Sequence, residues 1–178
     1  MKRLFAFLGL VFALTVLLFG SWYVSKMLLP EGLLRPYFSR LFQARVGEIA
    51  FIKILLANLL PFLGVQFMNL YRGRRWPGGL YVLPIFWVLY GVSLGTNSFV
   101  YAGPPVPFSI SIIWTRVGFT ELLAYTLGYA ATQEWALWQG LWHAKRIPGK
   151  KWNPKIQDWI YWGMGALLLA AAALREAR

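Results

Sequence analysis

An unbroken run of uncharged, mostly apolar residues extends over residues 4–25, directly after Lys2 and Arg3. A helix needs about 20 such residues to cross the hydrocarbon core of a bilayer. A cleaved signal peptide shares the basic start, but its apolar region normally has only about 7–15 residues and ends at a small-residue cleavage site. Here Trp22 and Lys26 are typical of an interfacial anchor, so we predict an uncleaved first membrane span over residues 4–25.

Further apolar stretches predict that the chain crosses the membrane repeatedly. They cover residues 49–71, 80–100, 109–132 and 157–174. Only 13% of the residues are charged and the mean hydropathy is +0.53, whereas a soluble domain usually has about 25% charged residues. We therefore predict an all-α membrane protein, with residues 1–178 forming a single helical membrane domain of about five transmembrane helices.

Residues 31–45 have a different pattern, with one apolar and one polar side at helical spacing. The apolar side consists of Leu33, Leu34, Tyr37, Phe38, Leu41 and Phe42. The polar side consists of Arg35, Ser39, Arg40 and Gln43. This pattern predicts an amphipathic helix lying in the membrane interface, and a short helix packed on the rest of the protein fits it equally well.

Basic residues greatly outnumber acidic ones. Lys and Arg number 18 against 6 Asp and Glu, which gives a net charge of +12. The basic clusters lie beside apolar stretches, so we interpret them as membrane-associated and exclude nucleic-acid binding. We predict lipid head-group contacts for Arg72, Arg74, Arg75, Lys145, Arg146, Lys150 and Lys151.

Two short loops differ sharply in charge. Residues 72–75 carry three positive charges, whereas residues 101–108 carry none. In multi-pass proteins the cytoplasmic loops hold the excess of Lys and Arg. We therefore predict a protein of the cytoplasmic (inner) membrane with its N-terminus inside and its C-terminus outside.

Glu121 is the residue that most suggests a function, because it lies about twelve residues into the fourth predicted span. An ionisable group at that depth is costly and marks a functional site by default. We predict that it contacts Asn58 on an antiparallel neighbouring span, in a polar cluster that also contains Asn97 and Arg116. Glu121 then either holds the bundle together or handles a proton or ion, and its charge state stays open. Helix packing around it is assigned to Gly118, Ala124 and Gly128.

The sequence offers little for catalysis. Gly91-Val92-Ser93-Leu94-Gly95 matches a nucleophile-elbow pattern, but a serine nucleophile needs a base. The only histidine, His143, lies in the basic loop after the fourth span. We therefore interpret Gly91 and Gly95 as a helix-packing face. With one His, no Cys and six scattered carboxylates, we predict no metal site, no cofactor and no enzymatic activity.

Three segments between residues 48 and 132 carry a family resemblance. They are FIKILLAN at residues 51–58 with Gly64, YGVSLG at residues 90–95, and GFTELLAY at residues 118–125. They resemble the stage II sporulation protein M family, bacterial and archaeal membrane proteins that typically have Gly, a hydrophobic residue, any residue, Glu and Leu at the third segment. The resemblance implies about five spans and a non-enzymatic role. The namesake anchors and assembles a complex of peptidoglycan-degrading proteins during engulfment.

Two hypotheses for function follow. The first is a non-enzymatic scaffold that recruits or positions partner proteins in the cytoplasmic membrane. The second is a subunit of a transporter or channel that moves an ion or small solute past Glu121. In both cases the expected partners are the lipid bilayer and other membrane or membrane-associated proteins, and a homo-oligomer is compatible with the sequence.

Overall fold

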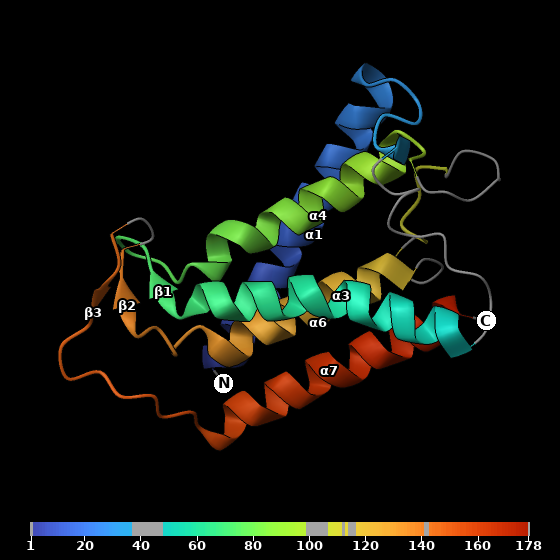
Figure 1. Cartoon of the computed structure of the whole chain (residues 1–178). Coiled ribbons are helices and arrows are strands. Elements are labelled where there is room, and N and C mark those ends of the chain that lie inside the picture. The colour runs from blue at the N-terminus through green and yellow to red at the C-terminus, as the bar shows by residue number, and fades with distance from the viewer. Residues whose placement is uncertain are drawn as a thin grey trace.

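The computed structural model describes residues 2–36, 48–98, 107–111, 113, 117–140 and 143–177. Within these residues the chain is mostly helical, as predicted (Figure 1). The helices are α1 (Lys2–Leu28), α3 (Glu48–Asn69), α4 (Gly79–Gly95), α6 (Val117–Thr132) and α7 (Ile156–Glu176). Three two-residue strands accompany them: β1 (Tyr71–Arg72), β2 (Trp138–Gln139) and β3 (Lys145–Arg146).

Among the described residues, two helices are long and apolar enough to cross a membrane, through residues Arg3–Leu28 and Phe51–Asn69. Within the most apolar 18 residues of each helix, only 11% are buried in the protein for the first helix and 28% for the second. The core helix of a soluble protein would be mostly buried, so this exposure favours helices that face lipid.

Two predicted span boundaries are wrong. The third span was expected to reach residue 100, but α4 ends at Gly95, and the backbone turns at Asn97 with a φ of 48°. The fourth was expected to begin at residue 109, but residues 110–111 form a turn and the described α6 begins at Val117.

The amphipathic helix expected over residues 31–45 does not begin where predicted. Residues 31–34 form a turn in which Gly32 has a φ of +77°. A left-handed residue of this kind cannot continue a right-handed helix. Residues 37–45, which complete the predicted helix, lie outside the described residues.

Consecutive helices alternate in direction, so one end of the molecule holds the starts of α1, α4 and α7 and the ends of α3 and α6 (Figure 1). The Asn69 amide, at the end of α3, donates to Thr132 Oγ1 at 2.8 Å and its oxygen accepts the Gly79 N–H at 3.0 Å. These contacts join α3 to α6 and to α4. At the same end, Arg3 of α1 reaches Asp158 in the first turn of α7. We call this end of the molecule the Asp158 end.

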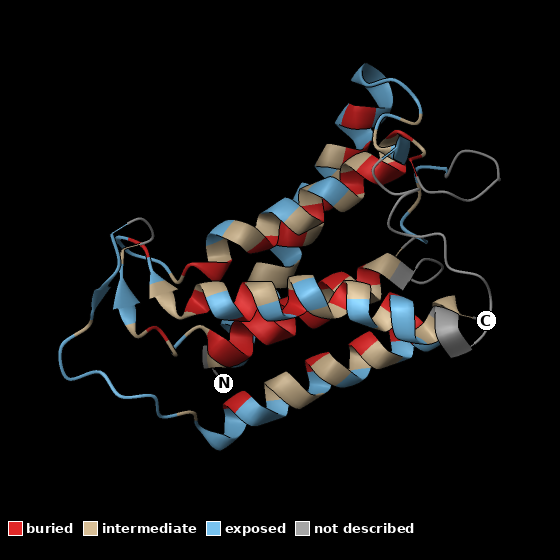
Figure 2. Ribbon diagram, in the orientation of Figure 1, coloured by how far each residue is buried: buried red, intermediate tan, exposed pale blue. Residues whose placement is uncertain are grey.

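Helix α6 lies at the centre and the other helices surround it. It packs against α7, α3 and α4, and residues 124–132 are all buried (Figure 2). The outer helices expose large apolar side chains, with exposed fractions of 72% for Phe12 of α1, 77% for Leu60 of α3 and 72% for Leu167 of α7. The molecule is therefore apolar on the flanks of its bundle.

Helix α1 packs on α4 through two glycines. A Cβ built at Gly91 would collide with Ser21 Oγ and lie 2.5 Å from the Leu18 carbonyl oxygen. A Cβ at Gly95 would lie 2.5 Å from the Trp22 carbonyl oxygen. Since the colliding atoms include backbone, the two helices approach this closely only because both positions lack a side chain.

A larger residue at this seam should loosen the bundle. We expect Gly91→Ala to lower the free energy of unfolding by about 1–3 kcal/mol, because the α1 backbone has to move away. Gly20→Ala is the matched control, since a Cβ there meets nothing within 4 Å. Equilibrium unfolding of the purified protein in detergent measures both. Equal stability of the two variants would contradict the close α1–α4 contact.

Candidate functional site

The first polar cluster joins the middle of α3 to α6. The Asn58 amide donates to the Glu121 carboxylate, and the Tyr125 hydroxyl donates to Asn58 Oδ1 at 2.9 Å. Asn58 and Tyr125 are buried and Glu121 is half-buried. The expected contact between Glu121 and Asn58 is therefore present, and both polar groups of the Asn58 side chain are satisfied.

The setting of this cluster differs from the prediction in two ways. Glu121 is the fifth residue of the described helix α6, and residues 110–111, which were expected to belong to the same span, form a turn. In addition, α3 and α6 run parallel: Asn58 contacts Tyr125, and Asn69, further along α3, contacts Thr132, further along α6. The expectation of antiparallel neighbours is wrong, because in a chain of alternating helices the second and fourth point the same way.

Of the two other residues predicted for this cluster, the structure places one elsewhere and does not describe the other. Asn97 lies past the end of α4, where its amide donates to Glu31 Oε1 at 2.9 Å. The prediction for Asn97 is wrong because α4 ends before it and the chain then turns toward Glu31. Arg116 lies outside the described residues.

The small residues of α6 face different neighbours. A Cβ at Gly118 would meet the ring of Tyr90 on α4, and one at Gly128 would lie 2.8 Å from Phe62 on α3. The Ala124 carbonyl oxygen lies 3.1 Å from a Cβ built at Gly165 on α7. These positions therefore let three helices approach α6 closely.

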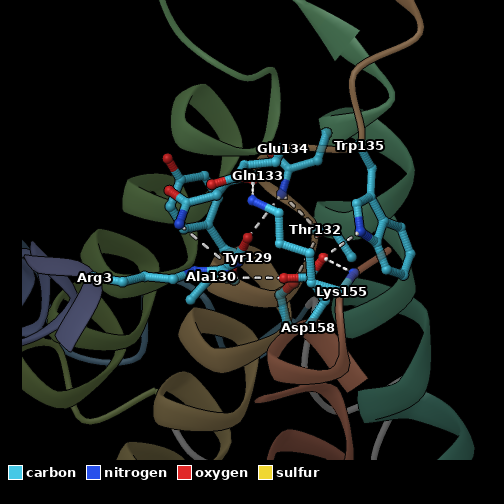
Figure 3. Close-up of polar contacts among 11 residues, drawn as sticks. Arg3, Tyr129, Ala130, Thr132, Gln133, Glu134, Trp135, Lys155 and Asp158 are labelled. Atoms are coloured by element: carbon cyan, nitrogen blue, oxygen red, sulfur yellow. Dashed lines mark hydrogen bonds and ion pairs between the residues drawn. The ribbon is translucent and has the colours of Figure 1, made fainter. Parts of the chain in front are cut away.

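A second polar cluster, which sequence reasoning missed, surrounds Asp158 (Figure 3). Arg3 Nη1 donates to Asp158 Oδ1 at 2.7 Å, and Arg3 Nη2 donates to the Ala130 carbonyl at 2.7 Å. The Trp135 indole donates to Asp158 Oδ2 at 3.2 Å, and the Lys155 N–H donates to the same oxygen at 2.9 Å. The exposed fraction is only 2% for the Asp158 side chain and 19% for that of Arg3. The ion pair thus joins α1, α6 and α7 within the protein.

A sequence signal for this site does exist. Asp158 is the only aspartate in the chain, and it follows Lys155 by three residues at the start of the last apolar stretch. An acidic residue at that position accepts the N–H of the capping residue and favours the start of a helix. The partner Arg3 is not predictable in this way, since it lies 155 residues away in the sequence.

The basic loops are brought together by a three-stranded sheet. Strand β1 pairs with β2 in parallel, and β2 pairs with β3 in antiparallel. The loop after α3 therefore lies beside the loop after α6, at the Asp158 end. All seven residues predicted to contact lipid head groups are exposed there: Arg72, Arg74, Arg75, Lys145, Arg146, Lys150 and Lys151.

The nucleophile-elbow pattern forms no catalytic arrangement. Ser93 lies in the last turns of α4, and its hydroxyl donates to the Leu89 carbonyl at 2.7 Å. His143 lies beside β3, at the opposite end of α4. In the part of the chain that the structure describes, no three His, Asp or Glu side chains are grouped so that they could hold a metal ion.

Comparisons with known proteins add no relative. No family model, curated protein or solved structure matches the chain. The description of its sites therefore rests on the geometry above.

Breaking the buried ion pair should be costly. We expect Arg3→Ala to lower the free energy of unfolding by about 3–5 kcal/mol, because Asp158 would be left as an uncompensated buried charge. The control is Glu134→Ala, which breaks the exposed Lys155–Glu134 pair and should cost about 0–1 kcal/mol. A double-mutant cycle of Arg3→Ala with Asp158→Asn, followed by unfolding in detergent, gives the coupling energy. Additive losses would contradict a direct interaction.

Proposed function

We propose that this chain is a multi-pass protein of the cytoplasmic membrane and that all five helices cross the bilayer. The alternating direction of the helices supports this proposal, because a chain that crosses repeatedly with short connections must alternate. The apolar flanks of α1, α3, α4 and α7 provide a surface for lipid. Helices α4 and α6 have only 17 and 16 residues, close to the lower limit of about 17 for crossing the hydrocarbon core.

The proposed orientation places the Asp158 end in the cytoplasm. Three basic segments gather there: residues 2–3, 72–75 and 145–155. Since cytoplasmic loops carry the excess of Lys and Arg, the N-terminus lies inside and the C-terminus outside. The same basic end is available to cytoplasmic partners or to the inner leaflet.

Cysteine labelling tests this orientation, and the chain helps because it has no native cysteine. A membrane-impermeant maleimide added to intact cells should label Ala102→Cys and leave Gly149→Cys unlabelled. Opening the membrane should then make Gly149→Cys reactive. The reverse pattern in intact cells would contradict the orientation.

For its role, we infer a non-enzymatic scaffold that positions partner proteins in this membrane. This inference rests on one observation, that the buried polar side chains form contacts between helices. Asn58, Asn69 and Asp158 each bind groups of other helices, so they stabilise one arrangement of the bundle. The resemblance to the stage II sporulation protein M family implies one class of partner to test, a complex that degrades peptidoglycan.

A transport role is the second candidate, and Glu121 favours it. Its carboxylate is half-buried between α3 and α6, and the Asn58 amide and the Tyr125 hydroxyl continue the polar contacts away from it. A chain of polar groups beside an ionisable residue is typical of proton and ion pathways. In this proposal Glu121 changes its charge as an ion or proton passes.

Substitution of Glu121 separates the two roles. If the protein is a scaffold, Glu121→Gln should fold and recover the same partners from native membranes, because glutamine still accepts the Asn58 hydrogen bond. Glu121→Leu should lower stability by about 1–3 kcal/mol, since it leaves the Asn58 amide unsatisfied.

If the protein is a transporter subunit, Glu121→Gln should fold normally but abolish proton or ion flux into proteoliposomes. Thr126→Val is the control, because it removes a buried hydroxyl that donates to the Leu122 carbonyl of the same helix and leaves the contacts of Glu121, Asn58 and Tyr125 in place. A fully stable and active Glu121→Leu variant would contradict both roles.

A further inference from the structure

The small sheet arranges its side chains in two rows. Tyr71 lies opposite Trp138, which lies opposite Arg146. Arg72 lies opposite Gln139, which lies opposite Lys145. Because side chains in paired register lie on the same face of a sheet, each face carries a basic residue from β3. The sheet therefore holds cations from two loops at fixed spacing, which neither loop could do alone.

Within the described residues, the cations of the sheet form no ion pair with an acidic side chain. Two ion pairs lie at this end of the described structure, Arg3–Asp158 and Lys155–Glu134, and both lie at the ends of helices α6 and α7 rather than on the sheet. We call the remaining exposed cations at this end the basic surface. It consists of Arg72, Arg74, Arg75, Lys145, Arg146, Lys150 and Lys151.

Exposed tryptophans lie among these cations along the chain. Trp76 follows Arg75, and Trp152 follows Lys151, with exposed fractions of 57% and 54%. Trp138 of β2, opposite Arg146, is 37% exposed. Tryptophan is enriched where a membrane meets water, because its ring is amphipathic and sits at the level of the head groups.

We propose that the basic surface binds the phosphate groups of anionic phospholipids in the adjacent leaflet. The surface begins where the apolar helices end: α3 leads into β1, and α4 starts two residues after Pro77. This position brings the cations to the depth of lipid phosphates, and the interleaved tryptophans suit that depth better than an aqueous protein partner. Each Lys or Arg near an anionic membrane surface adds to the attraction. The inference rests on the proposed membrane location and on neither the scaffold nor the transport role.

Binding of short-chain lipids to the detergent-solubilised protein tests this inference without depending on orientation. Native mass spectrometry should show dioctanoyl phosphatidylglycerol bound with about tenfold or greater preference over dioctanoyl phosphatidylcholine. The Arg74→Gln/Arg146→Gln variant should lose about tenfold in affinity for phosphatidylglycerol. Lys26→Gln/Lys53→Gln, which removes two exposed cations from the opposite end, should bind as the unmodified protein does.

Two further experiments show whether the basic surface binds lipid phosphates, free phosphate or an acidic peptide. Arg74→Lys/Arg146→Lys keeps the charges and should keep most of the affinity, which also shows that the sites tolerate substitution. Inorganic phosphate and an oligoglutamate peptide should compete poorly with phosphatidylglycerol. Equal binding of the two lipids, or unchanged affinity in Arg74→Gln/Arg146→Gln, would overturn the proposal. Oligoglutamate binding more tightly than phosphatidylglycerol would overturn it in favour of an acidic protein partner. Each of these results leaves the cysteine-labelling test unaffected.

Discussion

The buried ion pair between Arg3 and Asp158 connects the first described helix to the last, and the arrangement of the bundle depends on it. Charges in apolar surroundings are costly unless they are paired and hydrogen-bonded. Asp158 meets this requirement with donors from Arg3, Trp135 and Lys155. Since Arg3 also binds the Ala130 carbonyl, the start of α1 is held against the ends of α6 and α7. The same end also carries the sheet and its exposed cations.

Central placement of α6 imposes a second constraint. In the proposed membrane location there is little hydrophobic driving force between helices, so association depends on close packing and on interhelical hydrogen bonds. The small residues Gly118, Ala124 and Gly128 allow close packing, because they let α4, α7 and α3 approach α6. Asn58 and Asn69 of α3 provide the interhelical hydrogen bonds, because they bind α6 at two points along its length. Two such points fix the register of these parallel helices, which a purely apolar contact would leave free to slide.

Much of the fold was predictable because apolar length and small-residue spacing are local properties of a sequence. The existence of the helices and the close approach at Gly91 follow from such patterns. The contact of Glu121 with Asn58 was predicted on another ground, because an ionisable group in an apolar helix needs a polar partner. The misjudged features depend on long-range geometry. The partner of Asp158 lies at the other end of the chain, and the sheet pairs two-residue strands from different loops. Asn97 was misplaced because hydropathy does not reveal that α4 ends at Gly95.

The most direct test of the proposal that all five helices cross the bilayer is the lipid exposure of α4 and α7. These two helices do not meet the length and hydropathy requirements for a span that α1 and α3 meet. Spin labels can be attached at Ile85→Cys on α4 and Leu167→Cys on α7, where the native side chains are 55% and 72% exposed. In liposomes, both labels should be relaxed strongly by oxygen, which concentrates in the bilayer, and weakly by a water-soluble nickel chelate. Strong relaxation by the nickel chelate at both positions would contradict a five-span membrane bundle.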